Sequence, residues 1–169
     1  MKRWIALGAL LPALATAEVK SASPESMLIE HRFTIAAPAA QVWEGLVHPE
    51  RWWPADHSWS GRRENLSLSP EIGGCFCERW DGNAVEHGRV VMVRPGKLLR
   101  LDAALGPLQE MAVTGVITVT LEEKDGATTM TVTHRVSGDA THKLDAFAPV
   151  VDGVNGEQFG NLAKFVEGR

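Results

Sequence analysis

The chain has 169 residues, with 17 basic and 21 acidic side chains and a formal net charge of −4 at pH 7. This length fits one domain with a sizeable apolar core. A net-acidic chain without a basic cluster is not expected to bind nucleic acid.

The first 17 residues have the pattern of a secretory signal peptide. Lys2 and Arg3 form a basic start, an apolar run covers residues 4–14, and residues 15–17 form a small-residue cleavage site. A membrane anchor is the alternative, but this run is shorter than the roughly 20 residues that a spanning helix needs. We expect cleavage after Ala17, a periplasmic or secreted protein without stable membrane insertion, and a mature net charge of −6, from 15 basic and 21 acidic residues.

The mature chain is predicted to start with a flexible lead-in over residues 18–27, which are small and polar. A single domain is expected over residues 28–167. Alternating side chains predict a half-buried strand over residues 28–35. Two short helices follow, over residues 39–47 and 49–53.

Six further strand-like segments are separated by turn signals. They cover residues 66–69, 74–80, 85–93, 97–105, 113–123 and 128–136. Their short connections favour an antiparallel meander.

The last 25 to 30 residues have the periodicity of an amphipathic helix lying on a sheet. Pro149 predicts a kink, or a helix that starts near Ala148. Together the elements predict an α+β helix-grip fold, in which a curved antiparallel sheet wraps around a long C-terminal helix. The curvature is expected to leave a cavity between helix and sheet.

This pattern contains residues that are typical of a known family. They are Phe33-Thr34-Ile35, Ala37-Pro38, Val42-Trp43, Pro49, Trp52-Trp53, Gly73-Gly74, Phe76, Trp80, Gly88, Val90, Pro95, Leu99, and residues 121–126 into Thr128. On these residues the chain resembles the START-like superfamily, also called SRPBCC or birch-pollen-allergen-like, and most closely the group named after the activator of heat-shock-protein ATPase. The resemblance implies an internal cavity for apolar or amphipathic small molecules. The superfamily includes carriers, sensors, co-chaperone domains and a few cyclases.

Candidate ligand contacts come from aromatic side chains and from polar side chains at inward positions. Adjacent residues on a short helix point about 100° apart, so one of Trp52 and Trp53 can enter the core while the other lines a pocket. His134 lies in the apolar register of its strand, as a core histidine or as a polar group that orients a ligand or moves a proton. Asn155 and Gln158 fall in the apolar arc of the last helix, where buried amides need partners. The predicted ligand-binding residues are Trp52, Trp53, Trp80, His134, Val151, Asn155, Gln158 and Phe159.

Small residues form a stripe on the last helix, composed of Ala146, Pro149, Gly153, Gly156, Gly160 and Ala163. Glycines inside a helix cost up to about 1 kcal/mol each relative to alanine. Close packing against a second chain would offset this cost and predicts a possible homodimer. A mobile helix that admits ligand is the alternative.

Cys75 and Cys77 are two residues apart in a predicted strand, which places their Cα atoms roughly 6.5–7 Å apart. An internal disulfide is therefore not expected, and two small buried side chains, an inter-chain bridge or a redox pair are the alternatives. Glu78 lies beside aromatic residues, so it is either a general acid with a raised pKa or a paired or solvated carboxylate. No phosphate loop, nucleophile elbow, dinucleotide fingerprint or spaced set of metal ligands is found. No catalytic residue, metal or cofactor is predicted.

These observations favour a non-catalytic binder or carrier of a small hydrophobic or amphipathic molecule. The first alternative is a small-molecule enzyme of the cyclase, hydrolase or isomerase type that uses His134 and a cavity carboxylate. The second is a protein-interaction or co-chaperone-like module.

Overall fold

The computed structural model describes residues 16–168, which form one eight-stranded antiparallel sheet of order β1-β2-β8-β7-β6-β5-β4-β3, two α-helices and five short 3-10 helices. The strands are β1 Thr16–Ser23, β2 Ser26–Ile35, β3 Leu66–Leu68, β4 Cys75–Trp80, β5 Asn83–Arg94, β6 Leu98–Asp102, β7 Thr114–Lys124 and β8 Ala127–Ser137. The α-helices are α1 Ala39–Leu46 and α2 Leu144–Val166. The 3-10 helices are η1 Pro49–Arg51, η2 Ala55–His57, η3 Arg63–Asn65, η4 Gly106–Met111 and η5 Ala140–His142.

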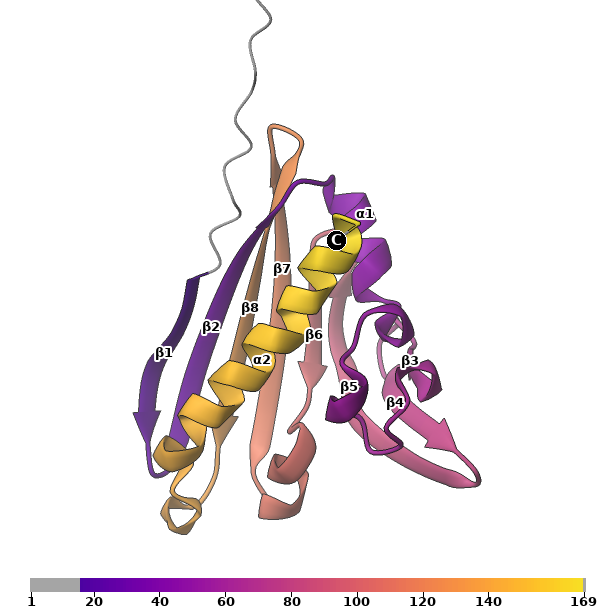
Figure 1. Ribbon diagram of the computed structural model, residues 1–169. Helices are drawn as coiled ribbons and strands as arrows, with labels where there is room; N and C mark the ends of the chain where they lie inside the picture. The colour runs from indigo at the N-terminus through magenta and orange to yellow at the C-terminus, as the bar shows by residue number, and fades with distance from the viewer. Residues whose placement is uncertain (1–15, 169) are drawn as a thin grey trace, which may run out of the picture.

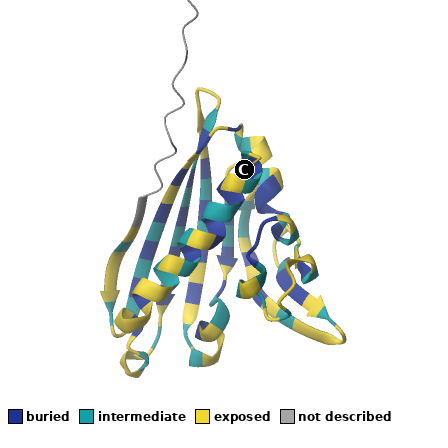
Figure 2. Ribbon diagram, in the orientation of Figure 1, coloured by how far each residue is buried: buried dark blue, intermediate teal, exposed yellow. Residues whose placement is uncertain are grey.

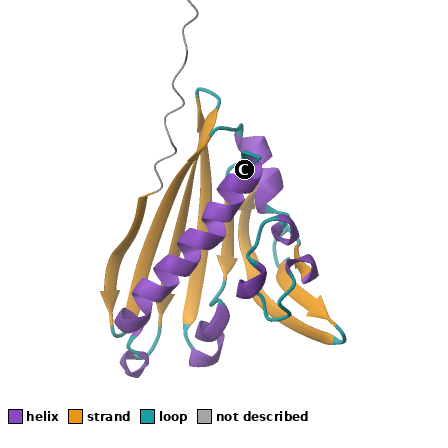
Figure 3. Cartoon of the chain, viewed as in Figure 1, coloured by secondary structure: helices purple, strands orange, loops and turns teal. Residues whose placement is uncertain are grey.

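The sheet curves around α2, which crosses its concave face diagonally (Figure 1). Helix α1 lies beside the C-terminal end of α2. The short helices between α1 and β3 lie over the end of the sheet formed by β3, β4 and β5 (Figure 3). The predicted α+β helix-grip fold is therefore confirmed, with short helices after the strand predicted over residues 28–35.

The N-terminal segment differs from the prediction. Residues 18–27 were expected to be a flexible lead-in, but β1 pairs with β2 from Thr16↔Arg32 to Ser23↔Ser26. A strand at the edge of a sheet forms its ladder through backbone groups and tolerates small polar side chains, so its composition alone does not indicate a strand. Residues 1–15, which contain most of the expected signal peptide, lie outside the described residues, and its cleavage stays a prediction.

The strands that face α2 alternate as predicted. On β8, Met130, Val132, His134 and Val136 are each at most 1% exposed, whereas the side chains between them are half-buried or exposed. Bands of buried residues cross the strands behind α2 in Figure 2. Burial of these side chains supplies the main driving force for closing the helix onto the sheet.

The buried apolar residues form two clusters. The larger one contains the C-terminal half of α2, with Phe159, Leu162 and Val166, packed with α1 and most of the sheet. The smaller one surrounds the start of α2 and consists of Met27, Ile29, Leu108, Val136, Leu144 and Ala148. Helix α2 is thus fixed at both ends, and residues 149–158 lie between the two clusters.

Helix α2 starts at Leu144, four residues before the alternative start near Ala148. Pro149 therefore lies inside the helix, in its second turn, where it has no N–H to donate to the carbonyl of Asp145. Among residues 16–168, no helix is long and apolar enough to cross a membrane.

Contacts within the chain explain two of the three glycines in the predicted small-residue stripe of α2. A Cβ atom at Gly156 would lie 3.0 Å from Cε1 of His31 on β2, and one at Gly160 would lie 3.8 Å from Phe33. Gly156 therefore lets α2 approach β2, where Nε2 of His31 lies 2.9 Å from Oδ1 of Asp152. Gly153, in contrast, borders open space, because a Cβ atom there would meet no atom of the described residues within 4 Å. One part of the predicted small-residue stripe therefore packs against β2 and another part does not.

The cysteines also differ from the prediction, because Cys75 and Cys77 form a disulfide. The ladder between β4 and β5 shifts register between Phe76 and Cys77, so this part of β4 is not regularly extended. The two Cα atoms lie 5.4 Å apart, within the range that a disulfide spans. The expectation of 6.5–7 Å assumed a regular strand.

Candidate functional site

A cavity of about 450 Å³ lies between the N-terminal half of α2, η2 and η4, and the strands β5 and β8. Its volume is in the range of small-molecule sites. The lining residues are Trp53, Asp56, His57, Ser58, Trp59, His87, Leu105, Gly106, Pro107, Leu108, His134, Phe147, Val150, Val151, Val154, Asn155 and Gln158. None of these side chains is a lysine or an arginine, and the only carboxylate among them is that of Asp56.

Exposed apolar side chains surround the cavity. Trp59, Phe147 and Val150 line it and are 49%, 37% and 64% exposed. Large exposed apolar side chains gathered at one place commonly mark a binding site, because each keeps apolar surface in contact with water. They come from two elements, the segment after η2 and the start of α2, which together border the cavity.

The predicted ligand-binding residues divide into three groups. Five of them line the cavity, namely Trp53, His134, Val151, Asn155 and Gln158. Trp52 and Phe159 instead line a separate apolar void of about 30 Å³, hardly more than the space of one water molecule. Trp80 lines neither space and is half-buried at the end of β4, where it pairs with Asn83.

The two adjacent tryptophans are both buried and follow η1, but their rings make different contacts. Nε1 of Trp52 donates to the carbonyl of Gly45 at 2.7 Å, which holds its ring in the core. Nε1 of Trp53 donates to the carbonyl of His57 at 3.1 Å. Because Trp53 lines both spaces, its ring forms the wall between the cavity and the apolar void.

His134 is buried at the inner wall of the cavity. Its Nδ1 lies 3.1 Å from Nδ2 of Asn155, so the amide donates and the ring nitrogen accepts. Nε2 then carries the hydrogen, and it has no hydrogen bond of normal geometry among the described residues. Burial lowers the pKa of His134 to about 4, although the Ala103 backbone opposes this shift. The ring is therefore neutral at pH 7.

A second buried histidine, His87 on β5, was not among the predicted ligand contacts. Its Nε2 lies 3.0 Å from Oε2 of Glu78, whose side chain is fully buried. Glu78 also accepts hydrogen bonds from the backbone N–H groups of Trp59 at 3.0 Å and Ser60 at 2.6 Å. This carboxylate therefore joins β4, β5 and the segment that carries the exposed Trp59.

The electrostatics of this pair decide between the two alternatives that the sequence left open for Glu78. Burial raises the pKa of the Glu78 carboxyl, but the hydrogen bonds from Ser60, Trp59 and His87 outweigh burial and hold its pKa below the ordinary value. Glu78 is thus an ionised hydrogen-bond acceptor, not a general acid with a raised pKa. Burial lowers the pKa of His87, while Glu78 opposes that shift.

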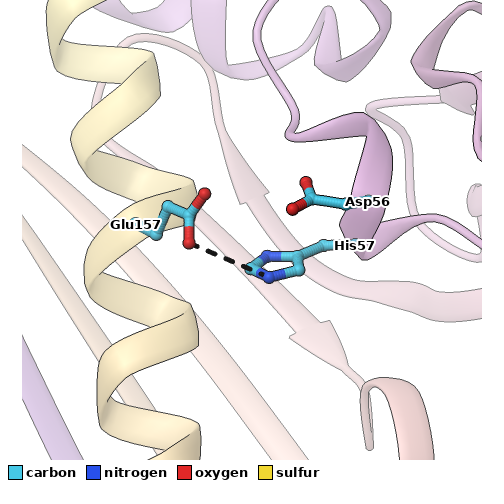
Figure 4. A group of neighbouring side chains, drawn as sticks. All are labelled: Asp56, His57 and Glu157. Carbon is cyan, nitrogen blue, oxygen red and sulfur yellow. Dashed lines mark ion pairs between the residues drawn. The ribbon is translucent and has the colours of Figure 1, made fainter.

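One group of side chains at the cavity mouth has the composition of a metal site. Asp56 and His57 on η2 and Glu157 on α2 have potential ligand atoms within 4.8 Å of one another. In Figure 4 the His57 ring points toward the Glu157 carboxylate, and Nε2 lies 3.8 Å from Oε2. Both carboxylates are exposed, so water would compete with them as a ligand for any cation. We assign no metal to this group.

Sequence reasoning missed His57, Trp59, His87 and Phe147 as cavity residues. For Trp59 and His57 the only signal was the aromatic and polar composition of a loop. The position of this loop depends on the hydrogen bond from Trp59 to Glu78, which is distant in the sequence. Phe147 lies in the first turn of α2, lines the cavity and is 37% exposed, a position that the periodicity of the helix alone does not identify.

Residues 36–167 match the family described as Activator of Hsp90 ATPase homolog 1-like protein. Solved structures of the same fold include an uncharacterized protein from Rhizobium leguminosarum, with 19% identity and a TM-score of 0.61 over 92% of this chain and 99% of that one. A Rhodobacter sphaeroides protein has 18% identity and a TM-score of 0.60 over 90% and 99% of the chains.

The di-domain ARO/CYC StfQ from the steffimycin biosynthetic pathway has 12% identity and a TM-score of 0.60 over 86% of this chain, which spans 52% of StfQ. No curated protein matches the chain. At these identities the solved structures show a shared fold. The family match covers most of the chain, so the protein belongs to the Activator of Hsp90 ATPase homolog 1-like family of the START-like superfamily.

Proposed function

We propose that the protein binds and carries a small hydrophobic or amphipathic molecule in the cavity beneath α2. The observation that carries this proposal is the cavity of about 450 Å³, bordered by the exposed side chains of Trp59, Phe147 and Val150. A bound apolar molecule would remove these surfaces from water, at a gain of roughly 25 cal/mol per Å² buried.

The compartment in this proposal is the periplasm or the cell exterior. The basic start, apolar run and small-residue site of residues 1–17 support it. The disulfide between Cys75 and Cys77 supports it as well, because disulfides persist mainly in oxidising compartments. A carrier there would move a poorly soluble molecule through an aqueous space.

The alternative of an enzyme built on His134 has less support from the geometry. The hydrogen-bond partner of His134 is the neutral amide of Asn155, and no ion pair joins its ring to a carboxylate of residues 16–168. A histidine with a pKa of about 4 is a weak base at neutral pH. Two other cavity histidines have carboxylate partners, His87 with Glu78 and His57 with Glu157.

Ligand binding can be tested on protein purified without denaturant. Native mass spectrometry should detect a co-purified small molecule, and lipids or aromatic compounds should quench tryptophan fluorescence through Trp53 and Trp59. The absence of any bound mass, together with no quenching across a broad panel of compounds, would contradict the proposal.

A pair of variants tests whether binding occurs in this cavity. Val154 lines it, whereas Val91 is 47% exposed and is not among the lining residues. Val154→Phe should weaken binding of the neutral fluorescent probe N-phenyl-1-naphthylamine about tenfold or more, because the added ring occupies ligand space. Val91→Phe should bind like wild type. Equal affinities in both variants would place the binding site elsewhere.

A further inference from the structure

The cavity contains a hydrogen-bond acceptor that is fixed by a buried carboxylate. Glu78 is ionised and has no proton to donate, so Nε2 of His87 must be the donor in their 3.0 Å contact. A neutral imidazole that donates from Nε2 has an unprotonated Nδ1. Among residues 16–168, no hydrogen bond occupies this Nδ1. It is also absent from the buried polar atoms that have neither a partner nor contact with solvent. We conclude that it borders the cavity that His87 lines.

The orientation of the His87 ring is restrained on several sides. Besides the bond to Glu78, the ring lies against Phe76, with ring centroids 5.0 Å apart. Only 4% of His87 is exposed, so the ring has little room to turn over. Glu78 itself is held by the backbone of Trp59 and Ser60, so the direction of the acceptor is fixed before any ligand arrives.

Gln158 on α2 has a second acceptor without a partner among the described residues. Gln158 lines the cavity from α2, is 3% exposed, and its Oε1 has no hydrogen bond in the described structure. An unpaired buried polar atom is costly, so a group that donates to it is favoured. Oε1 of Gln158 is closed off from solvent in this structure, so a donor would reach it only after the side chain turned, and Nδ1 of His87 is the accessible acceptor of the two.

The cavity has nothing to neutralise an anion. Its lining contains no lysine or arginine, and Asp56 lies at its mouth with Glu157 nearby. The ionised Glu78 lies behind His87. Burying a carboxylate or phosphate without a cation is strongly unfavourable, so fatty acids and phosphorylated head groups do not suit this space.

We propose that the bound molecule is an uncharged, largely apolar compound with a hydroxyl group, and that this hydroxyl donates a hydrogen bond to Nδ1 of His87. The proposal rests on the function proposed above and narrows it to a ligand class. His87 contacts the ligand, and Glu78 is a positioning residue that selects the ring's tautomer.

The test uses four compounds that share one apolar ring system: pyrene, 1-hydroxypyrene, 1-methoxypyrene and 1-pyrenecarboxylate. Their affinities for wild-type protein are measured by fluorescence titration at pH 7.5. One neutral hydrogen bond should make 1-hydroxypyrene bind about 3- to 10-fold tighter than pyrene. The methoxy compound, which cannot donate, should lose this advantage, and the carboxylate should bind more weakly than pyrene.

The variant His87→Phe should bring the affinity ratio of 1-hydroxypyrene to pyrene to about one. The control His48→Phe, at a half-buried histidine that is not among the cavity lining residues, should keep the wild-type ratio. If His87→Phe does not fold, the hydroxy and methoxy comparison in wild type decides the question alone. Equal binding of these two compounds would overturn the ligand class while leaving the carrier function intact. If no compound of the series binds, both the ligand class and the cavity-binding function are refuted.

Discussion

Burial of His134 predicts that the stability of the folded protein decreases as the pH falls below 6.5. In the folded protein its pKa is about 4, lowered from 6.5 by burial. Above pH 6.5 the ring is neutral in the folded and unfolded states, and it contributes no pH dependence. Below pH 6.5 the unfolded chain takes up a proton that the folded protein does not, so stability falls as the pH falls toward 4 and then levels off.

The magnitude follows from the same two values. At 1.36 kcal/mol for each pH unit, the depression from 6.5 to about 4 corresponds to roughly 3 kcal/mol, of which about 2.5 kcal/mol is expressed between pH 7.5 and 4.5. His87 and Glu78, whose pKa values are also lowered, destabilise the fold in acid in the same direction. A comparison with a variant separates the part that belongs to His134.

The assay is urea denaturation followed by tryptophan fluorescence at pH 7.5 and 4.5, on wild type and His134→Gln. A glutamine carbonyl can still accept from Asn155 but does not titrate, so the variant should lose about 2.5 kcal/mol less than wild type over this interval. Equal losses in the two proteins, within about 0.5 kcal/mol, would refute the reasoning. If the variant does not fold, NMR of wild type gives the same decision, because the His134 ring should not titrate between pH 5 and 8.

Three further predictions concern the supports of the cavity. Gly153→Ala should stabilise the protein by about 1 kcal/mol through helix propensity, whereas Gly156→Ala should give no such gain because its Cβ would meet His31; equal melting temperatures for the two variants would contradict this. Glu78→Gln should lower the free energy of unfolding by about 2–3 kcal/mol. The amide has one acceptor oxygen in place of two, so it cannot accept from all of Trp59, Ser60 and His87, and an unchanged midpoint in urea denaturation would count against this. Pro149→Ala should raise the free energy of unfolding by about 1–3 kcal/mol, because alanine restores an N–H that can donate to the carbonyl of Asp145; a lower urea midpoint in this variant would contradict the prediction.

The fold followed from the sequence because its signals are local and periodic. The alternation of Met130, Val132, His134 and Val136 placed the histidine inside, and its burial confirms this. The positions of Asn155 and Gln158 on the helical wheel likewise placed both amides toward the sheet, where they are buried. Such predictions need only the period of the element.

Other features depend on contacts between distant residues, which periodicity does not report. The disulfide between Cys75 and Cys77 depends on an irregular register between β4 and β5. The place of Trp59 at the cavity depends on a hydrogen bond to Glu78, 19 residues further along the chain. Trp80 was predicted to contact ligand from its residue type, but its position at the end of a hairpin takes it away from both internal spaces.

The existence of the cavity can be traced to the composition of α2. Toward its C-terminal end, apolar residues such as Phe159 and Leu162 pack against the sheet and α1. One turn earlier, Asn155 and Gln158 occupy the equivalent inward positions, and their amides cannot replace an apolar contact without losing hydrogen bonds. Nδ2 of Asn155 donates to the neutral ring of His134, whereas Oε1 of Gln158 has no hydrogen-bond partner among the described residues. The inward side of α2 is therefore apolar at both ends of the helix and carries two amides between them. This arrangement holds the helix onto the sheet without closing it over the space that the proposed ligand would occupy.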